Sequence, residues 1–459
     1  MPIASHSGWD IDTKPSEHGE ATRVTLVDYS SLKPRSFGEY VRSAYAEKGL
    51  VVQPRMGFAE PARMAAGLAA TRAARANTVG TITVDSYTRV GDHEHVRTAL
   101  EHGLQLNGYP IVDHPADVTA KALDGILSES FPVQVRHGSA RPGAIFAALS
   151  RLGLDASEGG PVSYCLPYGR VPLRESINNW SEATSQFAFQ SGGTAHLETF
   201  GGCLLGQLCP PSVLVALSVL EARFFCLHGV SSVSLSYAQQ THFEQDIEAV
   251  AAMRRLATEF VPARDVHFVL YAYMGVYPRT RKGALELLRE AAHLAVATGM
   301  ERLIVKTSAE AHRIPTIAEN VEALEEADDA ARHPGDRHPA DPGNAGSDCV
   351  YREARNLVEA VLELSPDLSR GLHIAFRRGI LDIPFCLHPD NAGRTRSRID
   401  PQGRLQWLDV GSMPISPTVE PVGPSVRLTS QGLLADLNLV RDRFDRPELA
   451  GRKPVAPID

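Results

Sequence analysis

Three arginines follow apolar, β-branched runs that are typical of buried strands. Arg55 follows VVQP, Arg89 follows TVDSYT and Arg136 follows VQV. If these runs are parallel strands of one barrel, their carboxyl ends bring the three side chains to the same face. Neighbouring guanidinium groups repel one another unless anions lie between them, and two-pronged contacts with carboxylates are their strong geometry. The pattern favours a dicarboxylate ligand, although pairing of each arginine with a local acid such as Asp85 or Glu60 remains open.

Two further groups of polar residues could take part in chemistry. Glu158, Tyr164 and Tyr168 lie in the run ASEGGPVSYCLPYGR. A carboxylate beside several arginines can hold an ammonium group and relay a proton, and phenols can donate hydrogen bonds to carboxylates. Lys306 and Glu310 are one helical turn apart at the end of another apolar run, a pair suited to a ribose or a phosphate. The alternatives are tyrosines that fill the core and a structural Lys–Glu salt bridge.

The elements that must position these residues alternate between strand-like and helix-like patterns. Helical periodicity follows several of the apolar runs, notably over residues 60–75, 243–260 and 280–299. Eight strand-like runs recur at the spacing of one strand, one helix and two loops, with one longer interval. These runs are residues 50–58, 80–87, 104–112, 132–138, 161–169, 232–240, 266–275 and 302–311. The pattern predicts a parallel (β/α)8 TIM barrel, and a doubly wound open sheet would produce a similar one.

The domain organisation follows from changes in composition along the chain. Residues 1–40 read as an N-terminal extension and residues 41–327 as the catalytic barrel. Residues 328–348 contain three prolines and three glycines without an apolar period, which predicts a flexible, exposed insertion. Residues 349–459 begin with a helical pattern and are expected to form a C-terminal appendage of helical and mixed structure packed on the barrel.

The bulk composition is typical of a globular enzyme. The 459 residues are 43% hydrophobic and 22% charged, and the formal net charge is -8. Because no long Lys/Arg run occurs, neither nucleic acid nor an anionic membrane is an expected partner. The six cysteines form no CxxC pair, which favours a reducing compartment, and no export or anchoring segment is apparent, so we expect a cytoplasmic protein.

Common cofactor and metal motifs are missing. The sequence contains no GxxxxGK[ST] phosphate loop, no GxGxxG after a strand, no HExxH and no CxxC zinc pattern. A metal site built by this chain alone is therefore not expected.

Several sequence blocks, in order, resemble the large (epsilon) subunit of glutamate mutase, also called methylaspartate mutase. They include QPRMGF, DSYTRV, LNGYP, VRHG, EGGPVSYCLPYGRVPLRESINNW, YMGVYP and RLIVKTSAEAHRIPT, and the resemblance extends over about residues 35–420. It implies an adenosylcobalamin-dependent isomerase of amino-acid metabolism that interconverts L-glutamate and (2S,3S)-3-methylaspartate. The implied route is a radical fragmentation and recombination of the carbon skeleton.

The resemblance also implies roles for individual residues. Arg55, Arg89 and Arg136 match the arginines that clasp the two substrate carboxylates, and His137 follows in the same loop. Glu158 matches the catalytic carboxylate that holds the substrate amino group. The other implied contacts are Tyr164 and Tyr168 with substrate, and Gly57, Asn107, Pro167, Tyr277, Lys306, Glu310 and Ile314 with the coenzyme, with Tyr277 standing where the family is expected to have phenylalanine.

The resemblance further implies a partner subunit. Cobalamin enzymes of this class bind the lower face of the cobalt through a histidine in DxHxxG, whereas the nearest matches here, DVHFVL and DRHPAD, lack the final glycine. The cobalt ligand is therefore expected on a separate small (sigma) subunit that carries DxHxxG. We expect a heterotetramer that contains a homodimer of this chain.

Three other functions fit parts of the pattern. The chain could be a cobalamin-dependent mutase that acts on a different dicarboxylate. It could be a barrel that has lost catalysis and serves as a binding or regulatory protein, although intact Arg55, Arg89, Arg136 and Glu158 argue against this. A phosphate-binding isomerase barrel would explain the arginines at strand ends, but not the blocks that match coenzyme contacts.

Overall fold

The computed structural model describes residues 36–167, 169–203, 208–333, 348–416 and 429–449. Eight parallel strands form one sheet in the order β1-β8-β7-β6-β5-β4-β3-β2. An isolated parallel bridge between Val52 and Thr78 joins the first strand to the segment before the second. The predicted (β/α)8 TIM barrel is thereby confirmed. Its strands are β1 (Val51–Gln53), β2 (Gly80–Thr83), β3 (Val133–Arg136), β4 (Ala156–Gly159), β5 (His196–Thr199), β6 (Ser232–Ala238), β7 (Asp265–Tyr271) and β8 (Arg302–Ile304).

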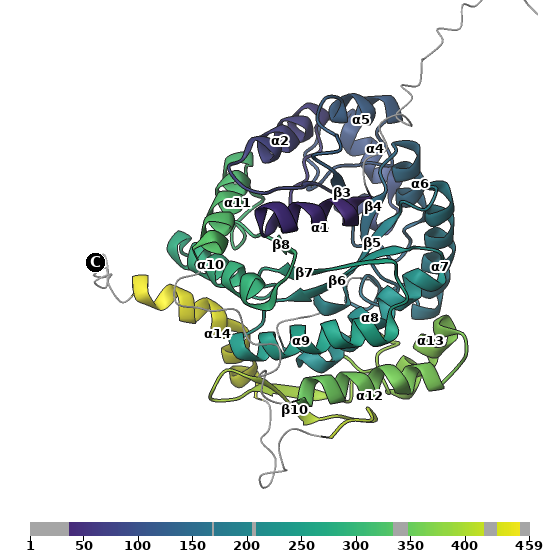
Figure 1. Ribbon diagram of the computed structural model, residues 1–459, viewed down its shortest axis with the longest axis vertical. Helices are drawn as coiled ribbons and strands as arrows, with labels where there is room; N and C mark the ends of the chain where they lie inside the picture. Colours follow the sequence, from purple (N-terminus) through teal and green to yellow (C-terminus); the bar gives the residue numbers. More distant parts are fainter. Residues whose placement is uncertain (1–35, 168, 204–207, 334–347, 417–428, 450–459) are drawn as a thin grey trace, which may run out of the picture. The chain divides into compact units, whose positions relative to one another are not determined.

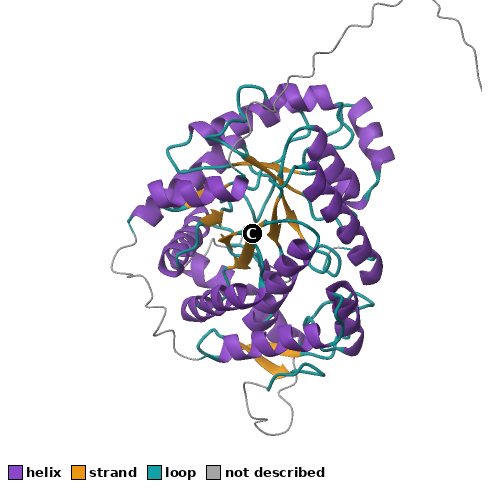
Figure 2. Ribbon diagram, turned by 45° about the vertical axis from the view of Figure 1, so that its right-hand side comes forward, coloured by secondary structure: helices purple, strands orange, loops and turns teal. Residues whose placement is uncertain are grey.

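Helices surround the strands (Figures 1 and 2). The helices over the barrel segment are α1 (Phe37–Lys48), α2 (Pro61–Ala73), α3 (Ser86–Val90), α4 (His93–Glu101), α5 (Ala116–Leu123), α6 (Gly143–Arg151), α7 (Leu173–Gln190), the 3-10 helix η2 (Gly201–Cys203), α8 (Pro211–Leu227), α9 (Phe243–Phe260), α10 (Arg281–Thr298) and α11 (Ile317–Arg332). Local signals set several ends. The Thr280 side chain caps the first turn of α10, and Gly299 ends it at a φ of 65°. None of the described helices combines the length and the apolar character that a membrane span requires.

The C-terminal elements pack on the outside of the barrel. Helix α12 (Cys349–Glu363) contacts α8 and α9, and α13 (Leu368–Arg378) contacts α7. A two-stranded antiparallel sheet follows, made of β9 (Arg396–Ile399) and β10 (Leu405–Asp409), and α14 (Ser430–Leu449) contacts α10. Of the predicted insertion, residues 334–347 lie outside the described residues, and α11 continues to Arg332 across its predicted start. Residues 1–35 of the predicted N-terminal extension also lie outside the described residues, and α1 begins before its predicted end.

Two of the eight predicted strands are wrong, and two real strands were missed. Residues 104–112 form a loop whose Tyr109 amide donates to the Thr83 carbonyl, and residues 161–167 form turns. Both segments are apolar because they cover the core. The first makes only an isolated parallel bridge, between Tyr109 and Val84, and neither forms a strand among its described residues. The missed strands are β4 and β5, with the sequences ASEG and HLET. Their buried polar side chains conceal the usual signal of a strand.

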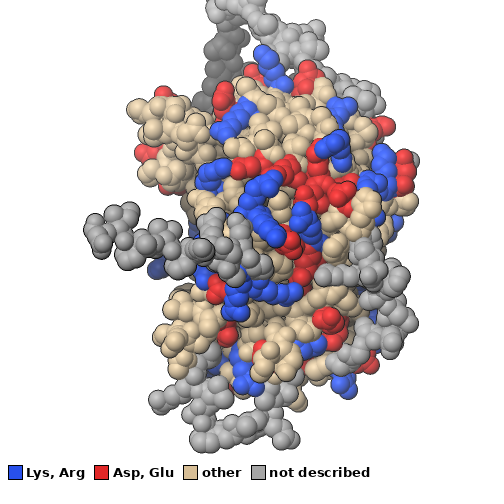
Figure 3. Space-filling model, turned by 90° about the vertical axis from the view of Figure 1, so that its left-hand side faces the viewer, with Lys and Arg blue, Asp and Glu red and all other residues tan. Residues whose placement is uncertain are grey.

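The outer surface of α10 and α11 carries interleaved charges (Figure 3). Ion pairs join Arg281 to Glu322 and Arg289 to Glu326 between the two helices, and Arg75 pairs with Glu325 of α11. Exposed pairs of this kind contribute little to stability. Because acidic and basic groups alternate among the described residues of α10 and α11, these two helices present no continuous basic patch for a polyanion.

Candidate active site at the carboxyl ends of the barrel strands

The three arginines singled out by sequence lie at the carboxyl ends of the first three strands. Arg55 follows β1, Arg89 lies in α3 directly after β2, and Arg136 is the last residue of β3. Burial disfavours the charge of Arg89, and the nearby charges of Arg55 and Arg136 further lower its pKa. Arg89 therefore lies close enough to Arg55 and Arg136 for their charges to act on it.

Arg136 and Glu158 form a buried ion pair. The Nε of Arg136 donates to Oε2 of Glu158 at 2.7 Å, and both side chains are almost fully buried. The hydroxyl of Tyr164 donates to the other carboxylate oxygen, Oε1. Burial opposes the charge of Glu158, but Arg136 and the hydrogen-bonding phenols lower its pKa overall. Glu158 is therefore held as a carboxylate whose neighbours are donors.

Arg55 pairs with Glu310, which also binds Lys306. Oε1 of Glu310 lies 3.2 Å from Nη1 of Arg55 and 3.1 Å from Nζ of Lys306. Burial lowers the pKa of Lys306 to about 8, although Glu310 raises it. Neither Asp85 nor Glu60 takes these arginines in the contacts described: Asp85 caps α3 by accepting from its backbone amides. The acids that pair with Arg55 and Arg136 belong to the candidate site itself.

The charges of these groups do not cancel. Arg55, Arg89, Arg136 and Lys306 supply four cations, whereas Glu158 and Glu310 supply two carboxylates. The remaining positive charge matches a ligand with two carboxylates. A cavity of about 320 Å³ opens beside Arg89. It is lined by Arg89, Val90, Gly138, Ser139, Ala140, Arg141, Tyr164, Gly169, Arg170, Val171 and Pro172.

His137 is buried beside the site in an aromatic cluster. Its ring stacks on Trp180 at a centroid distance of 5.7 Å and meets Tyr164 edge-on. Burial lowers the pKa of His137 to about 3, so the imidazole is neutral at physiological pH. Its Nδ1 accepts from the amide of Ser139 at 3.0 Å. The ring therefore supports Tyr164 and the loop after β3.

The residues matched to coenzyme contacts lie in loops after several strands. At Gly57 a Cβ would collide with the carbonyl oxygen of Thr83, so the glycine permits a close approach of two backbones. Asn107 is exposed and accepts from the amide of Ser86 at 2.9 Å. Tyr277 is buried, with Nζ of Lys306 over its ring at 5.1 Å. Ile314 is exposed and Pro167 half-buried, while Tyr168 lies outside the described residues.

Sequence reasoning missed three residues that contact this site from inside the barrel. Tyr271 ends β7, and its hydroxyl oxygen lies 2.7 Å from Oε2 of Glu158. Glu198 of β5 lies within hydrogen-bonding distance of the same hydroxyl and pairs with Arg302 of β8. The run VHFVLYAYMG contained a usable signal for Tyr271. This polar residue is the last of β7, just as Arg136 is the last of β3. No comparable signal marked Glu198, because its strand was not recognised.

A buried glutamate anchors the loop that carries Tyr164. Oε1 of Glu221 on α8 accepts from the amides of Val162 and Ser163 at 3.2 and 2.9 Å, and Oε2 accepts from the Ser163 hydroxyl at 2.9 Å. Burial raises the pKa of Glu221 to about 7, despite these hydrogen bonds. Ionisation of Glu221 inside the folded protein therefore lowers the free energy of unfolding.

The substitution Glu221→Gln is expected to remove a pH dependence of stability. In the wild type, protonated Glu221 makes its full contribution to the free energy of unfolding below about pH 4.5, and this contribution is lost as the pH rises to about 7. Glutamine keeps the shape without titrating, so the free energy of unfolding of the wild type should fall relative to the variant by roughly 3 kcal/mol across this range. Urea unfolding of both proteins at the two ends of the range measures the difference. Parallel pH curves for the two proteins would contradict the expectation.

Comparison with known proteins points to one family. A sequence model of the methylaspartate mutase E chain matches residues 33–430. The glutamate mutase epsilon subunit of Yersinia enterocolitica is 29% identical over 349 residues, which cover 72% of each chain. That of Halobacterium salinarum is 31% identical over 342 residues, covering 72% of this chain and 71% of the relative. That of Desulfitobacterium hafniense is 30% identical and covers 74% of this chain and 72% of the relative.

The resemblance inferred from the sequence blocks is therefore confirmed. The family match covers most of the chain, including every strand of the barrel and all the arginines of the site. With its (β/α)8 architecture and its cluster of cations at the strand ends, this chain belongs to the methylaspartate mutase E chain family of isomerase-type enzymes.

Proposed function

We propose that this chain is the catalytic subunit of an adenosylcobalamin-dependent glutamate mutase that interconverts L-glutamate and (2S,3S)-3-methylaspartate. The single observation that carries the proposal is the convergence of Arg55, Arg89 and Arg136 at the carboxyl ends of the strands, with Glu158 paired to Arg136. Its unbalanced positive charge suits a dicarboxylate, and Glu158 supplies a partner for an ammonium group. The names of the relatives support the same reaction.

In this proposal the arginines bind and orient the substrate. Arg55, Arg89 and Arg136 divide the two carboxylates between them, while Glu158 holds the amino group and can exchange a proton with it. Tyr164 and Tyr168 add hydrogen bonds to the substrate. His137 contributes through its position in the loop after β3, because its own ring is buried against Trp180.

The proposed coenzyme fits the polar and apolar groups at the barrel mouth. Glu310 is 25% exposed beside Lys306, and Ile314 is 55% exposed, so hydrogen-bonding and apolar surfaces are both available. Lys306 and Glu310 would hold the ribose. The remaining contacts would come from Gly57, Asn107, Pro167, Tyr277 and Ile314. When bound, adenosylcobalamin supplies the radical chemistry, and the protein supplies binding, orientation and shielding.

The protein's own contribution to a fragmentation route is to keep the pieces together. In such a route the substrate divides into two fragments, each of which carries one carboxylate. Separate arginine contacts to each fragment keep the reacting carbons within reach until they recombine. The deep burial of Arg136 and Glu158 excludes water from the same site.

The proposed partner is a small sigma subunit that carries DxHxxG and ligates the cobalt. His267, in the segment closest to that motif, is fully buried inside the barrel and its Nε2 faces Arg302 at 3.3 Å. This histidine is enclosed by its own strand neighbours and is not available to a corrin. The other similar segment, DRHPAD, lies outside the described residues. We propose a heterotetramer in which two copies of this chain form a homodimer.

The experiment that tests the proposal is reconstitution. The purified chain alone is expected to be inactive. Mixed with a small DxHxxG subunit, adenosylcobalamin and L-glutamate, it should produce 3-methylaspartate and a paramagnetic resonance signal that requires both coenzyme and substrate. The same mixture without the small subunit is the control. Absence of both product and signal from the complete mixture would overturn the proposal, whereas turnover of a different dicarboxylate alone would reassign the substrate.

A further inference from the structure

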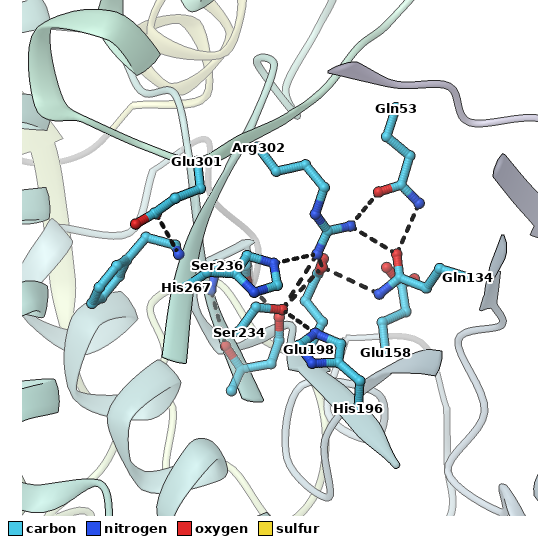
Figure 4. A network of polar contacts seen from close by, with 12 residues as sticks. Gln53, Gln134, Glu158, His196, Glu198, Ser234, Ser236, His267, Glu301 and Arg302 are labelled. Atoms are coloured by element: carbon cyan, nitrogen blue, oxygen red, sulfur yellow. Dashed lines mark hydrogen bonds and ion pairs between the residues drawn. The ribbon is translucent and has the colours of Figure 1, made fainter. Parts of the chain in front are cut away.

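A polar network fills the interior of the barrel beneath the candidate site (Figure 4). Arg302 of β8 lies at its centre and is fully buried. The guanidinium contacts side chains from five other strands: Gln53, Gln134, Glu198, Ser234 and His267. Its ion pair with Glu198 is also fully buried. A buried charge is costly unless it is paired and hydrogen-bonded, and this arrangement meets both conditions.

Two glutamates of this interior lie side by side on neighbouring strands. Glu158 of β4 and Glu198 of β5 are directly paired in the register of the parallel sheet, and both side chains are buried in the barrel. Each has its own arginine, Arg136 for Glu158 and Arg302 for Glu198. Two carboxylates in such proximity resist being ionised together.

The hydroxyl of Tyr271 joins the two glutamates. Its oxygen lies 2.7 Å from Oε2 of Glu158, is within hydrogen-bonding distance of Oε1 of Glu198, and accepts from Nη2 of Arg136 at 3.3 Å. A phenol has one hydrogen and can fully donate to only one of the two carboxylates. Burial raises the pKa of Tyr271 well above its usual value, so the hydroxyl keeps that hydrogen. With both carboxylates ionised, one of the two close oxygen–oxygen contacts would lack a hydrogen.

We propose that Glu158 and Glu198 share one additional proton through the hydroxyl of Tyr271, and that Tyr271 and Glu198 are positioning residues for Glu158. The added proton supplies the hydrogen that the second contact lacks. It also leaves one negative charge on the pair of carboxylates. The groups that face the pair are Arg136, Tyr164, Arg89 and His137 around Glu158, and Arg302, Gln134 and Ser234 around Glu198.

The location of this proton determines the charge of Glu158. With the proton on Glu198, Glu158 is an anion and can pair with an ammonium group, which agrees with the lowered pKa of Glu158 beside Arg136. Transfer of the proton to Glu158 would suit the site to a neutral amine. In the transfer, Glu158 Oε2 gives its proton to the phenol oxygen while the phenol gives its own to Oε1 of Glu198. One O–H bond breaks and one forms at the phenol, which is neutral before and after. The role in catalysis rests on the proposed function, whereas the shared proton does not.

The proton can be detected in the isolated chain by infrared difference spectroscopy at neutral pH. A protonated carboxylic acid has a carbonyl stretching band that a carboxylate lacks. We expect Glu158→Gln and Glu198→Gln each to lose the same acid band, because removal of either partner lets the other ionise beside its arginine. The double variant should lose no more than either single variant. Glu221→Gln is the matched control, since this separate buried acid should lose a band of its own that adds to the others.

Tyr271→Phe provides a test that keeps both ion pairs, and with them the buried charges of the barrel. We expect a shift in the frequency of the shared acid band, because its hydroxyl partner is gone. Two separate bands lost additively from Glu158→Gln and Glu198→Gln, no band lost from either, or an unchanged band in Tyr271→Phe would each overturn the proposal. The measurement uses neither coenzyme nor substrate, so failure of the mutase assignment would leave its result unaffected.

Discussion

The substitution Arg136→Lys is expected to lower kcat/KM by about 100-fold, close to 3 kcal/mol of transition-state stabilisation. The Nε of Arg136 binds Glu158 at 2.7 Å and Nη2 binds the Tyr271 hydroxyl at 3.3 Å, so one planar group serves two buried partners. A lysine ammonium keeps the charge but is a single point on a flexible stem and cannot reproduce this geometry. Steady-state kinetics of the reconstituted enzyme measures the loss.

A matched control separates this effect from general loss of an arginine. Arg404 is partly buried and forms an ion pair with Glu248 at 2.6 Å, but both groups lie outside the barrel mouth. Arg404→Lys should retain activity close to the wild type. Wild-type turnover by Arg136→Lys would show that Arg136 does not bind the substrate. If Arg136→Lys lowers the midpoint of unfolding and Arg404→Lys does not, Arg136 has a structural role.

Helices and barrel class could be predicted because their signals are local. The periodicity of residues 243–260 matches α9 residue for residue, and the Thr280 cap and Gly299 terminus bound α10. Strands β4 and β5 could not be predicted in the same way. Their buried side chains His196, Glu198 and Glu158 are polar, and each binds a polar side chain of another strand: Ser232, Arg302 and Arg136, respectively. Apolar patterning therefore assigned strands to the covering loops instead.

The arginines of the site were predicted from the sequence, but the residues beneath them were not. Arg55, Arg89 and Arg136 follow recognisable runs, and any parallel barrel brings such strand ends together. Tyr271 contacts Glu158 across 113 residues of sequence, and Arg302 contacts Glu198 across 104 residues. Such pairs are set by strand register and barrel closure, which a local pattern does not encode.

The substitution Glu158→Gln is expected to lower kcat by about 1,000-fold, within the range for loss of a positioned acid–base group. Glutamine fits the same space: its amide oxygen can still accept from Arg136, and its amide nitrogen can donate to the hydroxyl oxygen of Tyr164. It cannot neutralise an ammonium group or accept its proton. Because Lys306 and Glu310 hold the proposed ribose site independently of Glu158, the dissociation constant for adenosylcobalamin should stay unchanged. Measuring kcat and coenzyme binding in the same preparation tests both expectations.

Glu301→Gln is the control for this change, since Glu301 is also a largely buried glutamate. It precedes β8 at the amino end of the barrel, where it pairs with Arg254 at 3.6 Å and accepts from the Phe268 amide. A variant at that end should keep its turnover, because the reacting groups gather at the opposite end of the strands. If Glu158→Gln lowers coenzyme affinity as much as kcat, Glu158 stabilises the structure of the barrel mouth and is not the group that binds the substrate amine. A selective loss of kcat would instead place its charge at the reacting centre.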